Sequence, residues 1–138
     1  MSNNIQVIVD AIKGQEFSHA ELLCWSELKN NPKSTDLYKL LGHSLLSQKK
    51  YHGAIDAYLK CLPARKEDFD IANNLGYAYR FIADIENAKK YIEIADKITP
   101  GSYPVLVNRT HIAFILRDFN ESKRLLEISF KNFDDKVD

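Results

Sequence analysis

The sequence predicts an all-α protein built from four helical hairpins of equal length. These hairpins correspond to the rows 1–34, 35–68, 69–102 and 103–136, which align without insertion or deletion. A shift by one row carries Gly42 onto Gly76 and Ala54 onto Ala88. Along each row apolar residues recur at spacings of three and four, as they do on one face of a helix. A large apolar residue also recurs midway through each row: Phe17, Tyr51, Ile85 and Phe119.

Each row is expected to hold two antiparallel helices joined by a short turn. In the third row the first helix is marked by an apolar stripe from Phe69 to Ile82. The second helix opens at 84–87 and buries the face of Ala88, Ile92, Ala95 and Ile98. It ends at Pro100 and Gly101, because proline cannot continue a helix and glycine suits the exit turn.

The two glycines inside helices predict close helix crossings. A glycine in a helix costs about 1 kcal/mol relative to alanine, so its presence needs a packing reason. Without a Cβ, Gly42 and Gly76 let a neighbouring helix approach, and Ala54 and Ala88 on the partner helices are small for the same purpose. A bulkier side chain there would overpack the crossing, at roughly 1–3 kcal/mol.

The outer rows keep part of this pattern. The first row has Ile8 in place of the glycine but retains Phe17 and Ala20. The fourth has Thr110 in place of the glycine and Ser122 in place of the alanine. Atypical terminal repeats are expected in a stacked array, because each meets a neighbour on one side only.

These signatures resemble the tetratricopeptide repeat family over the whole chain. The third row reads Leu75-Gly76, Tyr79, Ala88, Ile92, Ala95 and Pro100, and the second reads Tyr38, Leu41-Gly42, Leu45, Ala54, Tyr58 and Cys61. The resemblance implies a right-handed α-solenoid of four helix-turn-helix repeats, about eight helices. It also implies one domain over 1–138, without a separate C-terminal capping helix.

Composition and motifs argue against several functions. The 19 basic residues balance 19 acidic ones without a run of one sign, so a nucleic-acid partner is not expected. No apolar run is long enough to span a membrane, and the N-terminus lacks the features of a signal peptide. We find no nucleotide-binding, metal-ligand or nucleophile motif, which predicts no catalytic residues, no metal and no cofactor. Cys24 and Cys61 occupy apolar or small-residue slots and are expected as free thiols in a reducing, cytoplasmic setting.

By resemblance to the family, the first helices of the repeats line a concave groove that binds a peptide. The groove slots hold amides, aromatics, histidines and an arginine, which suit an extended chain with backbone donors and acceptors. These residues are Lys39, His43, Asn73, Asn74, Tyr77, Arg80, Phe81, Asn108, His111 and Phe114.

Asn74 and Asn108 share one slot in successive repeats. They resemble a two-rung piece of the asparagine ladder with which protein O-linked N-acetylglucosamine transferases grip peptide backbone. The alternative is a local polar contact or simple solvation. The family's clamp for C-terminal carboxylates matches only at Lys39 and Asn74, so an adaptor for chaperone tails is not favoured.

The last helix of the fourth row is apolar on more than one side, through Leu125, Ile128, Phe130 and Phe133. Two explanations are open: self-association through an exposed end, or membership of a longer protein. We favour self-association, which predicts a solution mass above that of one chain.

The leading functional prediction is a non-enzymatic scaffold that binds an extended segment of a partner protein. A substrate-docking or regulatory module of a protein-modifying enzyme is the second hypothesis. A small secretion-type chaperone is the third, and the even repeats without a long N-terminal extension count against it.

Overall fold

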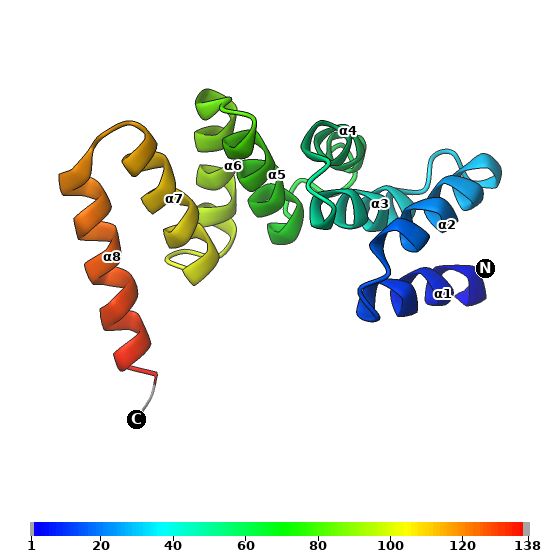
Figure 1. Ribbon diagram of the computed structural model, residues 1–138, viewed down its shortest axis with the longest axis horizontal. Helices are drawn as coiled ribbons and strands as arrows, with labels where there is room; N and C mark the ends of the chain where they lie inside the picture. The colour runs from blue at the N-terminus through cyan, green and yellow to red at the C-terminus, as the bar shows by residue number, and fades with distance from the viewer. Residues whose placement is uncertain (1, 137–138) are drawn as a thin grey trace. The chain divides into compact units, whose positions relative to one another are not determined.

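The computed structural model describes residues 2–136, and over this range it contains eight helices and no strand (Figure 1). The helices are α1 (Ser2–Lys13), α2 (Phe17–Asn30), α3 (Thr35–Ser47), α4 (Tyr51–Cys61), α5 (Phe69–Phe81), α6 (Ile85–Ile98), α7 (Tyr103–Ile115) and α8 (Phe119–Asp134). The predicted all-α architecture of helical hairpins is confirmed.

The helix boundaries recur at the same place in successive rows. The first helices of the last three repeats begin at Thr35, Phe69 and Tyr103. The second helices begin at Phe17, Tyr51, Ile85 and Phe119, the large apolar residues that mark the middle of each row. These side chains therefore sit where the chain re-enters a helix and can cover the turn.

The chain forms two compact units, Met1–Lys66 with α1–α4 and Glu67–Asp138 with α5–α8. Within the first unit, α3 packs against both α1 and α2. Within the second, α7 packs against both α5 and α6. In each unit the first helix of one repeat thus covers the hairpin before it. The organisation of the whole chain as one domain stays a prediction.

The turns inside the four repeats share a left-handed residue that the sequence did not reveal. Gln15, Lys49, Ala83 and Arg117 all have φ near +60°, and each occupies the same position in its row. In the third repeat the N–H of the following residue, Asp84, donates to the carbonyl of Tyr79 at 3.0 Å. This bond closes a Schellman-type helix end, in which glycine is the usual residue.

The glycine crossings are as tight as the sequence predicts. A Cβ built on Gly42 would lie 2.8 Å from the Tyr58 ring, and one on Gly76 would lie 2.3 Å from Cδ1 of Ile92. Ala54 and Ala88 are both fully buried on the partner helices. Either crossing would have to open to accept a side chain.

Both cysteines are free and buried, as predicted. Burial raises the pKa of the Cys24 thiol to about 12, and the charge of nearby Glu21 adds to this effect. The Cys61 thiol donates to the Ala57 carbonyl at 3.5 Å. Both side chains therefore act as small apolar core residues.

Candidate peptide-binding surface

Most of the residues predicted to bind a peptide lie on α5 and α7 of the second unit. They are Asn73, Asn74, Tyr77, Arg80 and Phe81 on α5, and Asn108, His111 and Phe114 on α7. The other two, Lys39 and His43, lie on α3 of the first unit. The candidate surface therefore consists of α5 and α7, which belong to one unit.

An arginine that contacts two neighbouring aromatic rings is the main feature of the α5 face. Tyr77 and Phe81 are one helical turn apart, and their ring centroids are 4.7 Å apart at a tilt of 45°. The Arg80 guanidinium carbon lies 4.6 Å from the Phe81 centroid and 5.1 Å from that of Tyr77. Such cation–π contacts hold the guanidinium in place. Phe81 remains 47% exposed, so part of this cluster is open to a ligand.

The two amides of the predicted ladder have different environments. The Asn108 side chain is 3% exposed, and its Nδ2 donates to Oδ1 of Asn73 at 3.0 Å. Its Oδ1 is buried and finds no hydrogen-bond partner among the described residues. Asn74 is half-buried at the surface of α5. Asn108 thus joins α7 to α5, whereas Asn74 keeps an accessible part.

His111 continues the surface onto α7, where its side chain is exposed. Its pKa is lowered, first by partial burial and then by the positive charge of Arg80. A lowered pKa favours the neutral imidazole at pH 7, so Arg80 supplies the positive charge of this face. Phe114, one turn further on, is 62% exposed and packs edge-on against Phe119 at 5.7 Å.

In the first unit Lys39 is half-buried and His43 is exposed on α3. The His43 ring meets Phe17 edge-on, with centroids 6.1 Å apart. Among the described residues there is no group of three or more His, Cys, Asp and Glu side chains that could hold a metal.

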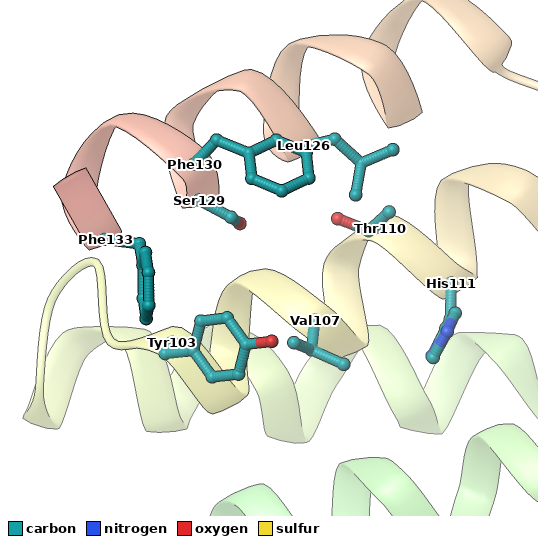
Figure 2. Close-up of a pocket in the computed structure, with 8 residues that line it drawn as sticks. All are labelled: Tyr103, Val107, Thr110, His111, Leu126, Ser129, Phe130 and Phe133. Atoms are coloured by element: carbon teal, nitrogen blue, oxygen red, sulfur yellow. The ribbon is translucent and has the colours of Figure 1, made fainter.

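A concavity lies between α7 and α8 and has a volume of about 690 Å³. Figure 2 shows side chains from the two helices facing one another across it. It is lined by Tyr103, Val107, Thr110, His111, Leu126, Ser129, Phe130 and Phe133. We call it the α7–α8 groove.

Two of the four residues predicted for self-association, Phe130 and Phe133, line the α7–α8 groove. Ile128 is half-buried, and Leu125 is 2% exposed and belongs to the core. The opposite wall, with Tyr103 and Val107, was not predicted. The repeat itself could have indicated this wall. Tyr103 and Val107 hold the positions of Phe69 and Asn73 in the preceding row, and Asn73 is one of the predicted groove residues.

Comparison with known proteins explains the repeating frame. The family model of the tetratricopeptide repeat matches residues 35–68 and 69–102, the second and third rows. The chain belongs to the tetratricopeptide repeat family. Across the described residues the fold has no helix long and apolar enough to cross a membrane.

One curated relative of this tetratricopeptide-repeat chain is "BBSome complex member BBS4" of Xenopus tropicalis, with 31% identity over 65 residues. The match covers 47% of this chain and only 13% of that relative. Most of the relative therefore lies outside the comparison.

Solved structures share the fold at low sequence identity. A double mutant of MamA RS-1 superposes with a TM-score of 0.87 at 16% identity, covering 96% of this chain and 75% of that one. A tetratricopeptide repeat protein of Parabacteroides merdae superposes with a TM-score of 0.82 at 12% identity, covering 94% of this chain and 51% of that one. These likenesses support the repeat solenoid as the fold class.

Proposed function

We propose that this tetratricopeptide-repeat protein is a non-enzymatic scaffold that binds an extended segment of a partner protein along α5 and α7. The observation that carries the proposal is the Tyr77–Arg80–Phe81 cluster, which combines open aromatic surface with a held positive charge. Repeats of this family serve as protein-interaction modules, which agrees with a binding role.

The chemistry of this surface suits one kind of peptide. Asn74 lies one turn from Tyr77 on α5, and its amide offers both a donor and an acceptor to an extended backbone. Arg80 suits an acidic side chain, since its planar guanidinium matches carboxylate geometry. Phe81 and Phe114 suit an apolar or aromatic side chain. We therefore expect a peptide with an acidic residue next to an apolar one.

A second candidate function is a docking module inside a larger assembly. The relative from Xenopus tropicalis is by its name a member of a complex, and the matched segment is a small part of that protein. In this case the same α5–α7 surface would bind a fixed subunit.

We also propose a cytoplasmic location, because a reducing compartment suits the two buried free cysteines. A nucleic-acid partner is not part of the proposal, since basic and acidic residues balance.

The test is selection of binders from a library of displayed random peptides, followed by fluorescence polarisation with the best peptide. Asn74→Ala and Tyr77→Ala should each weaken binding by roughly 1–3 kcal/mol, the range for a lost amide pair or an aromatic anchor. Circular dichroism should show that both variants keep their helical content.

Lys89→Ala is the matched control, because Lys89 is an exposed residue of α6 that lies outside the Tyr77–Arg80–Phe81 cluster and lines a different cleft. Its affinity should equal that of the native chain. An equal loss in Lys89→Ala and Tyr77→Ala would refute the assignment of the site to this surface.

A further inference from the structure

The α7–α8 groove corresponds to a position that is filled by a helix in the preceding repeat. The residues of the preceding repeat at the positions of Leu126 and Ser129 are Ile92 and Ala95. Ile92 and Ala95 are buried in one cluster with Val105 and Ile112 of α7. The groove therefore has the shape of a site that accepts a helix with an apolar stripe.

The groove differs from that filled position in being more apolar. In the preceding repeat Asp96 pairs with Arg109 of the covering helix at 3.4 Å. The residue equivalent to Asp96 in α8 is Phe130, which is 68% exposed. Tyr103 and Phe133 are 63% and 65% exposed. A helix that fills the groove must therefore carry apolar residues where α7 carries a charge.

We propose that the occupant is α8 of a second copy of this chain. Leu126, Phe130 and Phe133 lie at positions i, i+4 and i+7, so they form one apolar stripe along α8. The stripe forms one wall of the α7–α8 groove, as Figure 2 shows. A two-fold axis then places the stripe of each copy in the groove of the other. This is the self-complementary geometry of a symmetric dimer.

The charges along the stripe support an antiparallel pairing. Lys123 and Asp134 are exposed and lie about three helical turns apart, so they follow one edge of the stripe. Their midpoint falls between residues 128 and 129, close to the midpoint of the stripe. Around one two-fold axis, each Lys123 therefore faces Asp134 of the second copy. Neither residue forms an ion pair inside the described part of the chain.

In a head-to-tail arrangement α1 of the second copy would fill the groove, and the polar residues of α1 do not suit an apolar site. The helix α7 covers the preceding hairpin with Asn108 and Ile112 among its residues. The residues of α1 at the same repeat positions are Gln6 and Asp10. Gln6 and Asp10 are both exposed and hydrogen-bonded to each other at 2.8 Å. With α1 in the groove, an uncompensated carboxylate would enter an apolar site, which is costly. The second copy therefore binds through α8.

The first test is the solution mass of the full chain by light scattering at micromolar concentration. We expect a mass twice the 15.9 kDa of one chain. Phe130→Glu should raise the dissociation constant of the dimer by roughly 100-fold, because it places a charge in the apolar interface. Leu22→Glu is the matched control, since Leu22 on α2 is also 68% exposed, and it should leave the mass unchanged.

The second test is a charge exchange that fixes the pairing. Lys123→Glu and Asp134→Lys should each raise the dissociation constant by roughly 10-fold, because each turns two attractive pairs into repulsive ones. The double variant should restore the native value. Circular dichroism checks that each variant is folded.

Three results would overturn the proposal. They are a monomer at micromolar concentration, a dimer that Phe130→Glu does not weaken, and a double charge variant that stays as weak as the single ones. A monomer that still binds the selected peptide through Tyr77 would refute the dimer and leave the proposed function standing.

Discussion

Each unit holds two repeats, and the contacts that connect the two repeats differ between the units. We call these contacts the joint of the unit. In the first unit the Gln48 amide donates to Glu21 at 2.8 Å and to the Phe17 carbonyl at 3.3 Å, and Lys50 pairs with Glu21 at 2.8 Å. The Ser18 hydroxyl donates to Oε1 of Gln48 at 3.0 Å. A polar network thus ties α2 to the end of α3.

Two rows further along the sequence, Lys89, Leu116 and Asp118 hold the equivalent positions of the second unit, in place of Glu21, Gln48 and Lys50. The signs of the charges are reversed, and an apolar residue replaces the amide that connected them. An open cleft of about 240 Å³ lies among these three residues. Asp118 instead caps α8 by accepting from the Glu121 N–H at 3.1 Å.

The second unit is held at its joint mainly by apolar packing, with Ile92 and Ala95 against Val105 and Ile112. The same repeating frame therefore supports two kinds of joint. The frame fixes where each helix lies, whereas the side chains decide whether hydrogen bonds or buried apolar area connect the repeats. The two joints should consequently respond differently to pH.

The glycine crossings are the feature that both units share, and breaking one should have the largest effect. Gly76→Leu should destabilise the second unit by about 3 kcal/mol, because Ile92 and the Ala88 carbonyl already contact the space that the new side chain needs. Urea unfolding followed by circular dichroism measures the loss. The single tryptophan, Trp25 on α2, reports the first unit by fluorescence. A circular dichroism midpoint equal to that of the native chain would contradict the prediction.

The steric part of the fold could be predicted from the sequence because it recurs at a fixed step. Gly42 and Gly76 predicted tight crossings, and the structure confirms them. The left-handed residues of the turns could not be predicted, because Gln15 and Ala83 are not residue types that signal positive φ. That these residues share one position of the repeat becomes evident only from the structure.

The candidate site was predictable in position and less so in chemistry. The slots on α5 and α7 follow from the repeat, but the sequence did not reveal that Asn108 turns toward Asn73 and is buried. Leu125 and Phe130 illustrate the same limit. Both are apolar residues of α8, and only the packing of α7 shows that one is buried and the other exposed.

The polar joint of the first unit predicts an acid-sensitive stability. Partial burial opposes ionisation of Glu21, but hydrogen bonds from Lys50 and Gln48 outweigh it and lower the pKa below the ordinary 4.5. A carboxyl with a lowered folded pKa stabilises the fold above its unfolded pKa, and this contribution is lost as pH falls through the folded value. The first unit should therefore lose stability below pH 4.5, by about 1–2 kcal/mol, the scale of charged hydrogen bonds.

Glu21→Gln should abolish this dependence, measured by urea unfolding with Trp25 fluorescence between pH 7 and pH 3. Glu121→Gln is the matched control in the second unit, because the Glu121 side chain is 36% exposed against 17% for Glu21, so solvent weakens its pair with Arg124 and the pH profile should change little. An unchanged acid slope in Glu21→Gln would remove the polar joint as its cause.

The smallest predicted effect concerns helix capping, which also separates the units. Asp84 and Asp118 cap α6 and α8 with their side chains, whereas Glu16 at the start of α2 makes no side-chain cap bond. The backbone angles of Glu16 (φ −88°, ψ 60°) are close to those of Asp84 (φ −86°, ψ 79°). The shorter carboxylate of Glu16→Asp can therefore accept from the first turn, which should stabilise the first unit by roughly 0.5–1 kcal/mol.

Asp84→Ala is the reciprocal change and should cost the second unit about 1 kcal/mol, because the Asn87 N–H and side-chain amide both lose their acceptor. Thermal unfolding followed by circular dichroism and by Trp25 fluorescence separates the two units. We expect a higher fluorescence midpoint for Glu16→Asp and a lower circular dichroism midpoint for Asp84→Ala. This pair of results would show that one side chain accounts for the difference in capping between the units. If Glu16→Asp left the fluorescence midpoint unchanged while Asp84→Ala lowered the circular dichroism midpoint, the matching backbone at residue 16 would not be enough to form a cap.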